Sequence, residues 1–166
     1  MIKKLRHPAS ERRSQASVLI LLLGLLTLAA CDTTGLGGTG TSGESRAQRM
    51  ADNGDHDEAA GAYMGLAVDA AGSERDRYTL LAVEQYLDAG DVARARTAFR
   101  DVAQPSSGPL LPLWSTDRAA LYLYYGDANA ALSLLEPLSR QSLSQRDRLR
   151  VEVLRADAWI QKQDPV

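Results

Sequence analysis

The dipeptide Gly-Asp recurs along this chain at a fixed spacing, and this repeat constrains the fold more than any other feature of the sequence. It stands at residues 54–55, 90–91 and 126–127, and a Gln-Asp pair follows at residues 163–164. Successive aspartates are therefore 36, 36 and 37 residues apart. A constant period of this length is typical of proteins built from stacked copies of one supersecondary unit.

Residues of matching size flank each pair. The residue eight before each aspartate is small and the one five before it is large: Ala47, Val83, Ala119 and Ala156, then Met50, Tyr86, Tyr122 and Trp159. Apolar residues at steps of three and four on both sides predict two amphipathic helices per unit. Glycine ends the first helix because a left-handed residue costs it little, and aspartate caps the second. Asp55 and Glu58 also have the spacing of a capping box.

Prolines interrupt the pattern at two places. Pro137 is expected to shorten or kink the second helix of the third unit, because proline lacks an N–H donor and crowds the preceding turn. Pro105, Pro109 and Pro112 predict a rigid, irregular connection between the second and third units. We therefore expect regular helical hairpins, with one irregular connection between the second and third units.

The first thirty residues differ from the rest. Basic residues precede the unbroken apolar stretch 18–30, which is the order of a secretory signal peptide. Thirteen helical residues rise roughly 20 Å, less than the ~30 Å hydrocarbon core of a bilayer. We therefore interpret residues 1–30 as an export signal.

The only cysteine of the chain follows this signal directly. The run Leu28-Ala29-Ala30-Cys31 resembles a bacterial lipobox, in which the cysteine becomes the lipidated first residue of the mature protein. Ordinary cleavage nearby, with an incidental free thiol, is the alternative. Residues 31–45 are rich in Gly, Thr and Ser and predict a flexible tether. Residues 46–166 then form the folded domain.

The composition argues against most catalytic chemistry. One cysteine and two histidines leave no thiolate cluster and no His-based constellation, and no nucleophile–base pair or phosphate loop is evident. Without residues 1–30 the chain holds 14 Lys and Arg against 20 Asp and Glu, which disfavours nucleic acid as a partner. We predict no enzyme, no cofactor, no metal site and no small-molecule substrate. The acidic turn at residues 52–58 and the arginines at 146, 148, 150 and 155 are interpreted as solvated surface.

The repeat pattern resembles the tetratricopeptide repeat (TPR), whose period is 34. The resemblance implies an all-α fold, a TPR-like solenoid of about three and a half helical hairpins. In that family the first helices line a concave groove that binds protein partners. Carried over to this sequence, the groove positions are Arg77, Glu84, Asp88, Tyr124, Arg150, Asp157 and Gln161.

The arrangement of residues 17–166, with the stretch Leu80 to Asp91, resembles the N-terminal region of the outer-membrane lipoprotein activators of class A penicillin-binding proteins, the LpoA family. The resemblance implies an envelope lipoprotein that faces the periplasm and stimulates peptidoglycan synthesis. We expect no counterpart of that family's second, C-terminal domain within these 166 residues. The residue after the predicted lipidation site is Asp32, which in enteric bacteria favours retention at the inner membrane. Because of the family resemblance we favour the outer membrane as the location and keep the inner membrane as the alternative. A generic lipoprotein scaffold for pilus or outer-membrane protein assembly is the alternative function.

Overall fold

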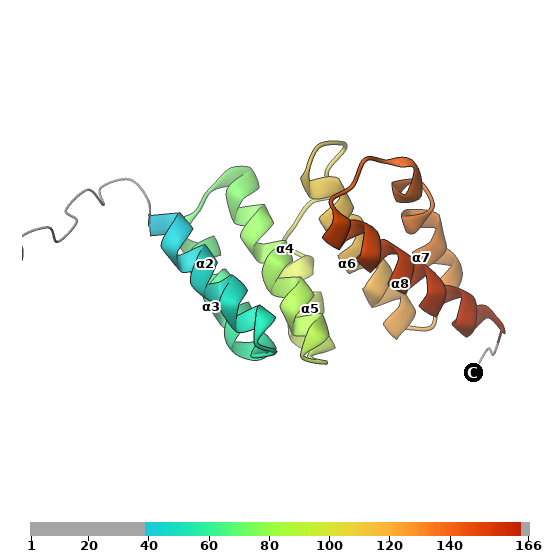
Figure 1. Cartoon of the computed structure of the whole chain (residues 1–166), viewed down its shortest axis with the longest axis horizontal. Helices are drawn as coiled ribbons and strands as arrows, with labels where there is room; N and C mark the ends of the chain where they lie inside the picture. The colour runs from blue at the N-terminus through green and yellow to red at the C-terminus, as the bar shows by residue number, and fades with distance from the viewer. Residues whose placement is uncertain (1–38, 164–166) are drawn as a thin grey trace, which may run out of the picture. The chain divides into compact units, whose positions relative to one another are not determined.

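The computed structural model describes residues 39–163, and every regular element in that range is a helix (Figure 1). This confirms the all-α prediction. The elements are α2 (Thr39–Asp52), α3 (His56–Asp69), α4 (Gly72–Asp88), α5 (Val92–Phe99), α6 (Leu110–Tyr124), α7 (Ala128–Leu135), the 3-10 helix η1 (Leu138–Arg140) and α8 (Gln145–Gln163). Neighbouring helices in the chain pack on each other, and α6 also contacts both α4 and α8.

The three Gly-Asp pairs form the turns α2–α3, α4–α5 and α6–α7. Gly54, Gly90 and Gly126 have φ angles of +86°, +77° and +82°, which glycine adopts without strain. In each turn the N–H of the aspartate donates to the carbonyl oxygen five residues earlier, over 2.8 to 2.9 Å. The same hydrogen bond thus closes each helix at a spacing of 36 residues, as the sequence predicts.

The aspartates do not all cap in the same way. The carboxylates of Asp91 and Asp127 each accept a hydrogen bond, 2.9 Å long, from a backbone N–H three residues on. Asp55 holds the same position before α3 but makes no such bond, so the predicted capping box is wrong. The start of α3 is tied to α4 instead, because His56 Nδ1 lies 2.9 Å from Gln85 Oε1.

Helix α2 begins at Thr39, inside the segment 31–45 interpreted as a tether. Arg77 on α4 donates two hydrogen bonds, of 2.7 and 2.8 Å, to the carboxylate of Glu44 on α2. This bidentate pair attaches the glycine-rich stretch to the fold, and the composition alone could not reveal it. The signal segment 1–30 and the predicted lipidation site Cys31 lie outside the described residues.

The prolines act largely as expected. Helix α7 ends at Leu135, two residues before Pro137, and a short 3-10 helix follows. Pro112 differs from the prediction, because it lies in the first turn of α6 rather than in the loop. The first turn of a helix tolerates proline since its N–H groups have no partner within the helix.

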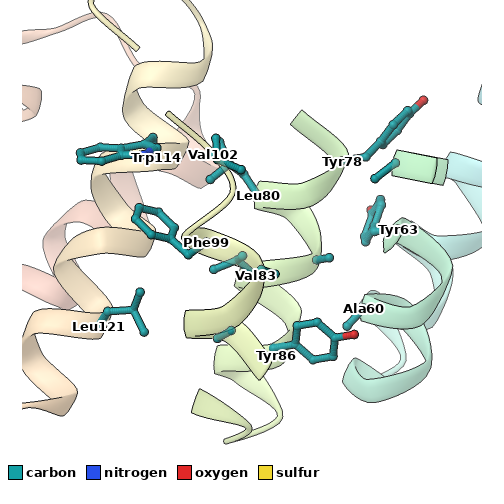
Figure 2. Packing of buried hydrophobic residues seen from close by; sticks show 14 of the residues in the cluster. Ala60, Tyr63, Tyr78, Leu80, Val83, Tyr86, Phe99, Val102, Trp114 and Leu121 are labelled. Carbon is teal, nitrogen blue, oxygen red and sulfur yellow. The ribbon is translucent and has the colours of Figure 1, made fainter. Parts of the chain in front are cut away.

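The buried apolar side chains form two clusters rather than the one continuous interior that stacked hairpins would share. The larger cluster spans α2 to α6 and includes Tyr63, Leu80 and Trp114; Figure 2 shows Phe99 on α5 facing Trp114 on α6. The smaller cluster joins α6, α7 and α8. The small residues predicted at the helix contacts, Ala47, Val83 and Ala119, are fully buried.

The predicted fourth unit has a different register from the one the sequence suggested. Ala156 is exposed and the Trp159 side chain is 49% exposed, whereas Val151 and Ala158 are buried. Helix α8 packs on α6 and α7 through one face, and its uncovered side still carries the exposed apolar side chains of Leu149, Val153, Trp159 and Ile160. No helix between residues 39 and 163 is long and apolar enough to span a membrane.

Candidate functional site: the groove between α4, α6 and α8

A groove with a volume of about 590 Å³ lies where α4, α6 and α8 meet. We call it the α4–α6–α8 groove. Its apolar lining is Leu87, Val92, Ala120, Val153 and Leu154. Its polar lining is Glu84, Asp88, Tyr124, Arg146, Arg150 and Asp157. Since α4, α6 and α8 are the first helices of successive predicted units, the surface is the one that the sequence assigned to partner binding.

Five of the seven predicted site residues line this groove, and two do not. Glu84, Asp88, Tyr124, Arg150 and Asp157 are brought together there. Arg77 lies in a neighbouring depression, where it pairs with Glu44. The side-chain amide of Gln161 donates to the carbonyl oxygen of Leu123 over 3.0 Å, which fixes α8 on α6. Arg77 and Gln161 therefore hold helices together.

Beneath the groove lies a buried ionic network. The guanidinium of Arg150 donates to Asp117 over 2.8 Å and lies 3.6 Å from the carboxylate of Glu84. It also donates to Thr116 Oγ1 over 3.1 Å. The exposed fractions of the Arg150, Glu84 and Asp117 side chains are only 17%, 8% and 0%. The network thus joins α4, α6 and α8.

Burial changes the protonation of these groups. Burial raises the pKa of Asp117 to about 7, although the charge of Arg150 opposes the rise. One carboxylate oxygen of Asp117, Oδ2, has no hydrogen-bond partner. Burial also raises the pKa of Asp88, which faces the same groove. The carboxylates of Asp117 and Glu84 raise the pKa of Arg150 despite its burial, so this arginine stays charged.

Two arginines depart from the sequence interpretation. Arg146 and Arg150 were interpreted as solvated surface, but Arg146 reaches Glu84 over 3.1 Å and Gln48 on α2 over 3.3 Å. The sequence did not single out Asp117 at all. Its only signal was that it is the one acidic residue in the mostly apolar stretch of residues 110–125. These pairs join residues 33 to 98 positions apart, which no local pattern predicts.

Three groove residues remain available to a partner. Tyr124 is 64% exposed, and Asp88 and Asp157 are also exposed. Within the described part of the chain, neither aspartate forms an ion pair. Together with Leu87 and Val153, these side chains offer an apolar strip flanked by two unpaired carboxylates. Such a surface suits a segment with apolar side chains and a Lys or Arg.

The described residues hold no group of three or more His, Cys, Asp or Glu side chains placed to bind a metal ion. In comparisons with protein-family models, curated proteins and solved structures, the chain matches none.

Proposed function

We propose that residues 39–163 form a TPR-like repeat unit that binds a protein partner in the α4–α6–α8 groove. The observation that carries the proposal is the groove itself, where five predicted contact positions converge. The identical turn at three positions 36 residues apart supports the assignment to helical-hairpin repeats. The partner segment would place apolar side chains against Leu87 and Val153 and a basic side chain near Asp88 and Asp157.

The proposed cellular location rests on residues 1–31. A signal segment followed by the lipobox ending at Cys31 supports a lipid-anchored protein of the bacterial envelope that faces the periplasm. We favour the outer membrane as the location, and Asp32 makes the inner membrane the alternative. Mass spectrometry of the N-terminal peptide of the mature chain tests this anchor, because lipidation of Cys31 adds the mass of the attached acyl groups.

The specific partner proposed is a class A penicillin-binding protein, whose peptidoglycan synthesis this chain would stimulate. The support is the resemblance of the lipobox, the glycine-rich stretch and the repeats to the LpoA family. A scaffold for assembling a pilus or inserting outer-membrane proteins would use the same groove, so the enzymatic readout separates the two.

A glycan-polymerisation assay with a class A synthase tests the proposal. We expect the mature chain to raise the rate of polymerisation. We also expect Tyr124→Ala, Asp88→Asn and Asp157→Asn each to weaken synthase binding roughly five- to thirtyfold, because interface side chains carry about 1–2 kcal/mol. Asp69→Asn, at the exposed end of α3, is the matched control. The absence of both binding and stimulation would favour the scaffold. Equal loss in the Asp69 variant would remove the groove from consideration.

A further inference from the structure

A second pocket, separate from the groove, lies between α5, α6 and α7 and has a volume of about 610 Å³. Arg96, Arg100 and Arg118 stand around the aromatic rings of Phe99, Trp114 and Tyr122. We call it the arginine pocket. No carboxylate lines it, although residues 39–163 as a whole carry 14 Lys and Arg against 18 Asp and Glu. It is thus a local positive site on an acidic unit.

The three guanidinium groups are not neutralised. None of them forms an ion pair within residues 39–163. Six other arginines in that range each pair with a carboxylate, namely Arg75, Arg77, Arg94, Arg146, Arg150 and Arg155. Arg96 Nη1 lies 3.4 Å from the hydroxyl of Tyr125, and Arg118 Nη2 lies 3.2 Å from that of Tyr122. Both partners are neutral, so the positive charge stays available to an anion.

The aromatic side chains give the pocket an apolar surface and one hydrogen-bond donor without a partner. Phe99 and Trp114 contact each other with ring centroids 5.3 Å apart, and the two rings face each other in Figure 2. Arg118 lies over the Tyr122 ring at 4.6 Å. The indole N–H of Trp114, a side chain only 8% exposed, has no hydrogen-bond partner. A buried donor without an acceptor is costly, which favours an acceptor oxygen entering this pocket.

From these contacts we infer that the arginine pocket binds an acidic peptide segment of a protein partner, with an aromatic side chain beside its carboxylates. The volume is in the range of sites that enclose a drug-sized molecule, far more than one inorganic ion fills. An anionic membrane surface fits less well, because the net negative charge of the unit opposes adsorption and three arginines add only modest attraction. The inference does not require the α4–α6–α8 groove, which lies on different residues.

The emission of Trp114 reports directly on the pocket. In a Trp159→Phe background Trp114 is the only tryptophan, and Trp159 is exposed enough to replace safely. The probe is the peptide acetyl-Gly-Asp-Phe-Asp-amide, and its neutral counterpart carries Asn in place of both Asp residues. We expect a saturable change in emission with the acidic peptide and binding at least about tenfold weaker with the neutral one.

Charge-removing variants complete the test. Arg100→Gln is expected to weaken binding of the acidic peptide about tenfold, and Arg96→Gln with Arg100→Gln about a hundredfold, since a charge-assisted hydrogen bond is lost at each position. The control is Arg49→Gln, an exposed arginine on α2, and Asp157→Asn checks independence from the groove; neither should change binding. Both pocket arginines are exposed, so unchanged melting temperatures should show that these variants fold.

Several results would overturn the inference. The inference is wrong if the acidic peptide causes no saturable change in Trp114 emission, or if the neutral peptide binds as tightly. It is also wrong if Arg49→Gln weakens binding of the acidic peptide as much as Arg100→Gln does. Inorganic phosphate and phosphatidylglycerol vesicles are titrated in parallel. If either one binds as tightly as the acidic peptide and shows the same dependence on Arg100, the assignment to a peptide is wrong.

Discussion

Arg150→Ala is expected to lower the free energy of unfolding by about 3–5 kcal/mol, the range measured when one partner of a buried ion pair is removed. The replacement would leave the carboxylates of Asp117 and Glu84 buried without their shared cation. Urea unfolding followed by circular dichroism measures the loss. Alanine at this groove position therefore changes the stability of the fold, and a loss of partner binding in this variant would not by itself show contact with the partner.

Matched variants separate the ionic network from a general effect of mutating α8. Arg148→Ala on the same helix removes an exposed side chain whose contact is a 3.5 Å hydrogen bond to the Leu143 carbonyl, and should change stability by no more than about 0.5 kcal/mol. Removing the three charges together, as Arg150→Met, Asp117→Leu and Glu84→Gln, should recover part of the loss. An Arg150→Ala variant as stable as Arg148→Ala would show that the network contributes nothing.

The protein is expected to lose stability as the pH rises from about 4 to about 7. Burial raises the pKa of Asp117 from its ordinary value of 3.8 to about 7 in the folded state, so in this window the folded state holds a proton that the unfolded state has released. The free energy of unfolding then falls with rising pH, by at most about 1.4 kcal/mol per unit. The raised pKa of Asp88 acts in the same direction. Glu44, whose pKa is lowered by Arg77, acts oppositely and only at lower pH.

Urea unfolding at about pH 5 and about pH 7.5 brackets this window. Asp117→Asn should remove most of the difference in the free energy of unfolding between the two pH values. The amide does not titrate, and it still offers an oxygen to Arg150. Asp69→Asn, an exposed carboxylate, should keep the full difference. Wild-type stability that is constant or rises between the two pH values would contradict the protonation of buried Asp117.

The parts of the fold that depend on local rules were predictable from the sequence. A Gly-Asp pair specifies its turn by itself, because glycine adopts positive φ and the following backbone bond closes the helix, so Gly54, Gly90 and Gly126 were placed correctly. Helix α8 had no such turn within the described residues, and its register was therefore misjudged at Ala156 and Trp159.

The parts that depend on contacts between helices were not predictable. The start of α2 relies on Glu44 meeting Arg77, which is 33 residues away. The candidate groove was located because family positions fall on the first helices, but the roles of its residues were mixed. Glu84 and Arg150 serve the buried network, whereas Tyr124 and Asp157 face outward. Only packing decides which side chains of an amphipathic helix are covered.

Site-specific photo-crosslinking in the cell envelope can show whether a partner docks in the α4–α6–α8 groove. A photoreactive phenylalanine at position 124 replaces an exposed groove side chain, and the same group at position 68 replaces Val68, which is 81% exposed on α3. We expect a crosslink from position 124 to a class A penicillin-binding protein and none from position 68. Crosslinks to that protein from position 68 alone, or equally from both positions, would contradict it.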